Sequence, residues 1–152
     1  MIIYIASDHA GFEMKRGLIE YLTQHGHHIY DCGPEMYDPT DDYPDYISIA
    51  AKHVSQKSEN QDVRGIVLGF SGQGEAIVAN KFRHIRCAVF YGGSKHVVTL
   101  SREHNDSNIL SLGAHFLTTQ EASQAVDLWL GTKFSNEPRH IRRIKKIEDL
   151  KV

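Results

Sequence analysis

The sequence predicts an α/β protein built on a parallel β-sheet that helices cover on both faces. Short apolar runs alternate with segments of helical periodicity along the 152 residues, a pattern typical of parallel sheets. The net charge is −2, and no apolar run approaches the ~20 residues that a membrane span needs. We therefore expect a single domain over 1–152, with no nucleic acid and no membrane as partner.

The five expected strands are apolar runs that end at glycine or at polar turn residues. They cover residues 2–6, 28–32, 65–68, 85–91 and 109–112. The first run lacks the basic flank of a signal peptide. The two cysteines, Cys32 and Cys87, have no metal-type spacing, and we interpret them as small buried residues. A reducing cytoplasm is the expected location.

Helices are expected where apolar residues recur with a period near 3.6. They cover residues 12–22, 45–55, 76–82, 94–103, 120–130 and 138–147. Thr119 is the expected N-cap of the fifth helix, and Gly131 ends it. The last helix is basic and carries isoleucines three residues apart, so we expect it to pack elsewhere, on a partner subunit. Between elements, 35–44 forms a polar loop of a length that is often functional, and 58–62 forms a polar connector.

Loops that follow the strands should carry the site, because ligands of parallel sheets bind outside the carboxyl ends of the strands. Asp8 and His9 follow the first strand, whereas Ser71 and Glu75 follow the third. The topology therefore brings these four residues together from distant parts of the sequence. Asp8 and His9 are either a helix N-cap and its neighbour or a pair that handles protons on a sugar.

The chain is organised around the glycine-rich turn from Gly69 to Ala76. Such strand-to-helix turns direct backbone N–H groups at one point, where anions and developing oxyanions bind. Glu75 either complements the helix dipole or acts as a general base, and the N–H groups should favour its carboxylate form. Ser71 lacks the G-x-S-x-G context of a nucleophile, so we expect its hydroxyl to stabilise the turn or to bind substrate. Gly72 and Gly74 permit a close approach of the ligand.

Other polar clusters have two interpretations each. Arg139 and Arg143 are four residues apart on one helical face, where they form a solvated surface or clamp a phosphate. His104 and Asn105 form a solvated helix end or reach the active site of a partner chain. A histidine cluster, residues 25, 27 and 28, has no Cys or carboxylate with it, and we interpret it as a solvated helix end rather than a metal site.

Six short motifs occur in an order that resembles a known family. They are Ser7-Asp8-His9-Ala10-Gly11, Asp42-Tyr43-Pro44, Gly72-x-Gly74-Glu75 with Ala79-Asn80-Lys81, Arg102-Glu103-His104-Asn105, Trp129-Leu130, and Arg139-His140-x-x-Arg143. Over essentially its full length the chain resembles the ribose-5-phosphate isomerase B family of the ribose/galactose isomerase superfamily.

The resemblance implies a Rossmann-like three-layer α/β/α sandwich with a five-stranded sheet. It also implies a homodimer, or a dimer of dimers, in which the C-terminal segment 136–152 packs on the partner subunit. The implied reaction interconverts D-ribose 5-phosphate and D-ribulose 5-phosphate through an enediolate, without metal or organic cofactor. An isomerase of galactose 6-phosphate or allose 6-phosphate and a non-enzymatic sugar-phosphate-binding module are the alternatives.

Roles for the site residues follow from the resemblance. Glu75 is the base, Ser71 and the turn hold the enediolate, and His104 with Asp8 opens the sugar ring. The phosphate-binding and orienting residues are His9, Tyr43, Gly72, Gly74, Asn105, Arg139 and Arg143. Two departures stand out. Many relatives carry a Cys base where this chain has Gly69, followed here by Phe70, and often an Arg that helps to hold phosphate where it has His115. The chain therefore resembles a branch in which a Glu replaces the Cys base.

Overall fold

The computed structural model describes residues 1–57 and 62–150. The expected connector 58–62 therefore lies almost entirely outside the described residues, as do the last two residues of the expected C-terminal segment 136–152.

A single five-stranded parallel sheet forms the centre of the molecule, as predicted. In spatial order its strands are β2 (His28–Asp31), β1 (Ile2–Ser7), β3 (Val63–Gly69), β5 (Ile109–Gly113) and β4 (Cys87–Phe90). All four strand pairs are parallel. In the central pair Gly69 lies beside Gly113, so the loops after β3 and β5 leave the sheet next to each other.

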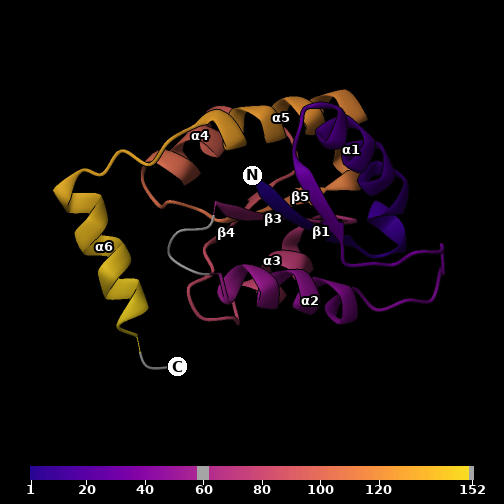
Figure 1. Ribbon diagram of the computed structural model, residues 1–152, viewed down its shortest axis with the longest axis horizontal. Coiled ribbons are helices and arrows are strands. Elements are labelled where there is room, and N and C mark those ends of the chain that lie inside the picture. Colours follow the sequence, from indigo (N-terminus) through magenta and orange to yellow (C-terminus); the bar gives the residue numbers. More distant parts are fainter. Residues whose placement is uncertain (58–61, 151–152) are drawn as a thin grey trace.

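Helices cover both faces of the sheet and produce the three layers visible in Figure 1. They are α1 (Phe12–Gln24), α2 (Tyr43–Ser55), α3 (Gln73–Ala79), α4 (His96–Glu103), α5 (Thr119–Gly131) and α6 (Pro138–Glu148), with 3-10 turns η1 (His9–Gly11) and η2 (Ala114–Phe116). One core cluster packs α1, α4 and α5 on one face, around the fully buried Trp129. The other packs α2 and α3 on the opposite face, through the buried Ile47 and Val54.

Several predicted boundaries needed correction. The helix expected over 76–82 begins at Gln73 and ends at Ala79, so Glu75 lies in its first turn rather than before it. Helix α2 starts two residues earlier than predicted, at Tyr43. The N-cap of α5 is Thr118 rather than Thr119. The hydroxyl of Thr118 accepts from the N–H of Glu121, and the Glu121 side chain accepts from the backbone N–H of Thr118, which forms a capping box. Cys32 and Cys87 are half-buried rather than buried.

Helix α6 lies apart from the sandwich, beyond the β4 edge of the sheet (Figure 1). It begins at the predicted residue and ends one residue later than predicted, at Glu148. Glu148 at its end pairs with Arg86 at 2.9 Å and with His84 at 2.6 Å. At its start His140 is buried and bonds the hydroxyl of Ser135. The exposed Ile141 and Ile147 contribute an apolar ridge to this helix.

A buried lysine that the sequence analysis did not single out holds the loop after β2. Lys15 of α1 is fully buried, and its Nζ donates to Oδ1 of Asp31 at 2.7 Å and to the carbonyl of Pro34 at 2.8 Å. A buried ammonium is stable only when it is paired, so α1 fixes the start of the loop 33–42, which leads from β2 to α2. In the described part of the chain, no helix combines the length and apolarity that crossing a bilayer demands.

Candidate functional site

The carboxylate of Glu75 lies directly over Gly69, the last residue of β3. A Cβ built on Gly69 would overlap Oε1 and Cδ of Glu75 and would lie 2.8 Å from Oε2. The side chain is buried, with the residue only 4% exposed. The missing side chain at position 69 therefore creates the space in which the carboxylate lies, at the carboxyl edge of the sheet.

Burial changes the acid strength of Glu75. Removal of the carboxylate from water raises its pKa above the usual value, and the negative charge of Asp8 adds to this, while a bond from its own backbone N–H opposes it. The sequence analysis expected the helix N-terminus to favour the carboxylate form. That expectation was wrong in sign, because desolvation outweighs the N–H groups. A raised pKa makes the group a stronger base.

The turn between Gly69 and Glu75 is rigidly packed. Gly72 adopts a left-handed φ of +77° at the N-cap of α3, a conformation that few residues other than glycine adopt. The buried hydroxyl of Ser111 donates to the Gly72 carbonyl at 2.6 Å. The Ser71 hydroxyl accepts from the N–H of Gln73 at 3.3 Å, which supports the turn and leaves Ser71 half-exposed at the same edge.

Tyr43 lies beside this turn. A Cβ on Gly74 would come within 2.8 Å of the Tyr43 ring and 2.9 Å of its hydroxyl. Gly74 therefore allows the aromatic ring at the start of α2 to pack against the backbone that carries Glu75.

Asp8 and His9 occupy the loop after β1, next to β3. Asp8 is buried and accepts from the N–H groups of Ala10 and Gly11, at 2.9 and 3.2 Å, so it is the N-cap of η1. His9 is bonded to Asp41, a residue of the loop before α2 that the sequence analysis did not name as a site residue. The bond to Asp41 raises the pKa of His9, against an opposing effect of burial.

These three side chains also have the composition of a metal site, with ligand atoms within 4.8 Å of one another. Asp41 Oδ1 already accepts two bonds from His9, and Asp8 caps η1. The His9–Asp41 pair and the cap thus account for the cluster without an ion.

The remaining predicted residues form a second group, which we call the C-terminal half-site: His104, Asn105, Arg139 and Arg143. His104 ends α4, and its ring centre lies 4.3 Å from that of His140 in α6. Burial lowers the pKa of His140, and the positive charges of its neighbours, Arg139 and Arg143 among them, lower it further. Both arginines are exposed, and Nε of Arg139 donates to Glu137 at 2.7 Å.

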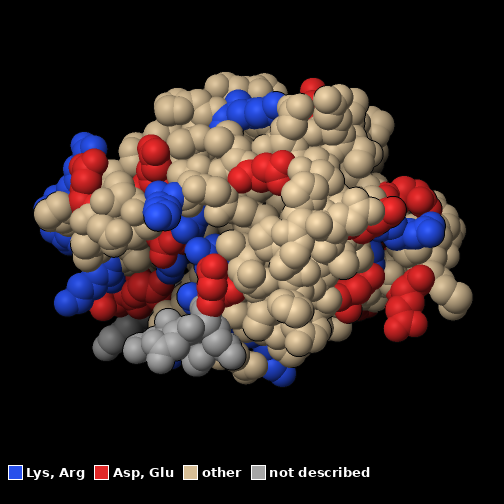
Figure 2. All heavy atoms as spheres, turned by 45° about the horizontal axis from the view of Figure 1, so that its top comes forward, with Lys and Arg blue, Asp and Glu red and all other residues tan. Residues whose placement is uncertain are grey.

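The structure does not bring this group to Glu75 within one chain. We call the other group the turn half-site: Asp8, His9, Tyr43 and the turn 71–75. It lies at the carboxyl end of the sheet, whereas His104 and Asn105 precede the amino end of β5, a strand about 16 Å long. Figure 2 shows basic side chains concentrated at the end of the molecule where Figure 1 places α6. The predicted site is thus divided between two places on the chain.

The two departures from the family pattern contact each other. The rings of Phe70 and His115 stack at a centroid distance of 4.0 Å and an interplanar angle of 15°. The backbone N–H of His115 donates to the Phe70 carbonyl at 3.1 Å. Phe116 packs edge-on against Phe70. Phe70, His115 and Phe116 are exposed, so an aromatic patch borders the turn half-site.

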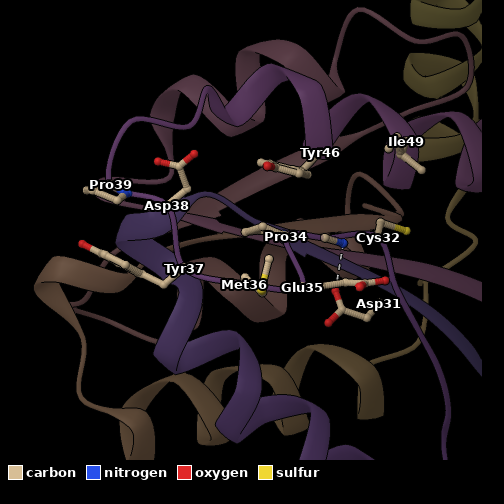
Figure 3. Close-up of a pocket in the computed structure, with 11 residues that line it drawn as sticks. Asp31, Cys32, Pro34, Glu35, Met36, Tyr37, Asp38, Pro39, Tyr46 and Ile49 are labelled. Carbon is tan, nitrogen blue, oxygen red and sulfur yellow. Dashed lines mark hydrogen bonds between the residues drawn. The ribbon is translucent and has the colours of Figure 1, made fainter.

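A hollow of about 760 Å³ lies beside the loop after β2, and none of the predicted site residues line it. Figure 3 shows it between the loop 31–39 and the side chains of Tyr46 and Ile49 on α2. A smaller hollow of about 280 Å³ is lined by Asn105 of the C-terminal half-site and by Ile147 of α6.

Known proteins share both the sequence and the fold. Residues 3–147 match the family model described as Ribose/Galactose Isomerase. Ribose-5-phosphate isomerase B of Mycolicibacterium paratuberculosis is 44% identical over 95% of this chain and 87% of its own length. The enzyme of the same name from Mycobacterium tuberculosis is 42% identical over 95% of this chain and 86% of its own length.

Solved structures agree. Ribose-5-phosphate isomerase B from Mycoplasma genitalium, with bound ribulose-5-phosphate, superposes with a TM-score of 0.90 at 35% identity and covers 97% of this chain and 93% of its own. The enzyme from Clostridium thermocellum gives 0.89 at 39% identity, with 98% and 96% covered. With its parallel sheet, its glycine-rich turn and these matches over nearly its whole length, the chain belongs to the ribose/galactose isomerase family.

Proposed function

We propose that this protein is a ribose-5-phosphate isomerase that interconverts D-ribose 5-phosphate and D-ribulose 5-phosphate with Glu75 as the base. The observation that carries the proposal is the buried carboxylate over Gly69, in a chain whose relatives at 42–44% identity bear the name ribose-5-phosphate isomerase B. Gly69 leaves no side chain that could compete with Glu75 for this position. In this branch of the family the carboxylate takes the place of the Cys base.

The chemistry is a proton transfer between two carbons of the open-chain sugar. Glu75 removes the proton from C2 of the aldose, and the electron pair forms an enediolate whose negative oxygen is held by Ser71 and the N–H groups of the turn. The proton returns to C1, and a hydroxyl proton moves from O2 to O1, which yields the ketose. The raised pKa of Glu75 suits this cycle, because the same group must accept a carbon-bound proton and then release it.

The C-terminal half-site completes the reaction from a second copy of the chain. His104 of that copy, with Asp8 of the first, moves a proton between the ring oxygen and the anomeric hydroxyl and so opens the furanose. Arg139 and Arg143 of that copy, with His9 of the first, hold the phosphate. Asn105 and Tyr43 orient the sugar hydroxyls. The separation of the two half-sites within one chain supports a homodimer in which the segment 136–152 packs on the partner subunit.

An isomerase assay with three substrates tests the proposal. Purified protein is given D-ribose 5-phosphate, galactose 6-phosphate or allose 6-phosphate, and ketose formation is followed spectroscopically with and without a chelator. We expect the highest kcat/KM with ribose 5-phosphate and no effect of the chelator. A preference for a six-carbon sugar would reassign the substrate, and binding without turnover of any of the three would make the chain a sugar-phosphate-binding protein.

A further inference from the structure

The bond between Asp41 and His9 links the loop 33–42 to the turn half-site. Nδ1 of His9 lies 2.6 Å from Oδ1 of Asp41, and the backbone N–H of His9 donates to the same oxygen at 3.0 Å. The two residues are 32 positions apart in the sequence. One carboxylate oxygen therefore fixes both the backbone and the ring of His9.

Asp41 is buried in a way that makes its charge costly unless His9 is positive. Its side chain is only 3% exposed, and among the described residues its other oxygen, Oδ2, is buried without a hydrogen-bond partner. An isolated buried carboxylate is strongly destabilising, whereas a buried pair of opposite charges is tolerated. The structure thus favours an imidazolium at position 9.

The surroundings of His9 carry further negative charge. Asp8 precedes it, and Asp38 lies on the same loop as Asp41. Within one chain, the bond to Asp41 has the largest effect on the pKa of His9 and raises it; burial opposes protonation, and the charges of Asp8, Asp41 and Asp38 favour the cation. The ring is 35% exposed, and Tyr37 contacts it edge-on with centroids 6.4 Å apart. Nδ1 is occupied by Asp41, which leaves Nε2 as the nitrogen that can donate to a ligand.

The loop that carries Asp41 is anchored at two other points. Lys15 holds the Pro34 carbonyl at its start, and Tyr37 packs edge-on against Phe12 of α1 with centroids 6.0 Å apart. Both anchors precede Asp41, and α2 begins two residues after it, at Tyr43, so Asp41 is presented to His9 by a segment that is held in place.

We propose that Asp41 is a positioning residue: it holds His9 by Nδ1 and keeps the imidazole positive, so that Nε2 donates a charge-assisted hydrogen bond to the phosphate of the substrate. The inference rests on the proposed function for the identity of the anion, but the coupling of the two side chains is a property of the free protein.

Asp41→Asn is the informative variant, with Asp38→Asn as its matched control. Asparagine keeps the oxygen that accepts from His9 and removes only the negative charge. Asp38 lies on the same loop but bonds Thr40 instead of His9. For Asp41→Asn we expect the KM for D-ribose 5-phosphate to rise about tenfold over the wild type at pH 8, because His9 of the variant is neutral at that pH. At pH 5.8 His9 is protonated in both proteins, and we expect the two KM values to agree within about twofold. Asp38→Asn should stay within about twofold of the wild type at both pH values.

NMR titration of the histidine rings checks the coupling without substrate. The His9 signal is assigned by its loss in His9→Asn, and its midpoint should be higher in the wild type than in Asp41→Asn. A KM ratio that is equally large at both pH values would show a merely structural role and overturn the inference, as would an equal effect of Asp38→Asn. If Asp41→Asn fails to fold, a wild-type His9 midpoint at or below about 6.5 overturns it and a higher one supports it. Absence of isomerase activity in the wild type would instead refute the proposed function, and the titration would still report on the coupling of Asp41 to His9.

Discussion

The two halves of the candidate site differ in how firmly contacts within one chain hold their side chains in place. In the turn half-site Glu75 is buried against Gly69, Gly72 is fixed by Ser111, and Tyr43 packs on Gly74. In the C-terminal half-site the arginines are exposed on a helix that stands apart from the sandwich. Proton transfer needs a base placed to within a fraction of an ångström, whereas a phosphate can be held by flexible cations. In the proposed dimer, the fold of one chain positions the base, and the partner chain supplies the cations that hold the phosphate.

The largest effect should follow from Glu75→Gln, which keeps the shape of the turn and removes the base. We expect kcat to fall by at least ~10²-fold with little change in KM. The thermal midpoint should not decrease, because a buried carboxylate with a raised pKa destabilises the folded state above that pKa. Steady-state kinetics and thermal unfolding measure the two quantities, with the exposed Glu13→Gln as control. Turnover close to that of the wild type would remove Glu75 from its role.

Mixing two inactive variants tests whether the half-sites meet across chains. Glu75→Gln damages only the turn half-site, and His104→Asn only the C-terminal one. In a mixed dimer one site then carries both lesions and the other carries none, so random exchange should restore about 25% of wild-type activity. Co-expression with two affinity tags isolates the mixed dimer, which has one intact site of two and should have about 50% of wild-type activity.

The matched control for this experiment pairs two lesions of the same half-site, Glu75→Gln and Asp8→Asn. Neither site of that mixed dimer is intact, so no recovery is expected. Equal recovery in both mixtures, or none in either, would contradict a site shared between chains.

Gly69→Ala should displace the carboxylate of Glu75 while leaving the Glu75 side chain itself unchanged. The added methyl group would occupy the position of the Glu75 carboxylate and push it toward solvent, for which we expect a loss of kcat of about 10- to 100-fold. Because a more exposed carboxylate has a lower pKa, the acid limb of the kcat profile should move to lower pH. Gly131→Ala is the control, since nothing lies within 4 Å of a Cβ there. An unchanged pH profile in Gly69→Ala would show that the carboxylate has not moved.

The sequence was sufficient for the sheet, for the helices and for the edge where the polar residues meet. Periodicity and turn residues determine these features locally, so the expected run 65–68 became β3 with its turn at Gly69. Boundaries were less certain where two residues of one type compete, as at the α5 N-cap, where Thr118 rather than Thr119 has its hydroxyl aligned with the N–H of Glu121.

The features that the sequence analysis missed depend on contacts between distant segments. The sequence analysis did not single out Lys15, which is buried because Asp31 and Pro34 of another segment supply acceptors. Asp41 looked like one of several loop carboxylates until the fold brought it to His9. The expected direction of the pKa shift of Glu75 was wrong, because the sequence shows the N–H groups of the turn but not the burial that outweighs them. Buried polar partners are thus the part of a site that periodicity cannot predict.

The smallest effect in this series should come from Arg139→Ala, and it should appear in KM. A phosphate is held alike in the ground state and in the transition state, so its loss weakens binding without slowing the chemical step. We expect KM for D-ribose 5-phosphate to rise about tenfold with kcat within about threefold. Inorganic phosphate as a competitive inhibitor should lose affinity by a similar factor. Lys145→Ala is the matched control, because Lys145 is an exposed cation of the same helix that is six residues from Arg139 and two from Arg143, and so lies on a different face. If Lys145→Ala raised KM as much as Arg139→Ala, the basic surface of α6 would act only through its overall charge, and α6 would hold no specific phosphate clamp.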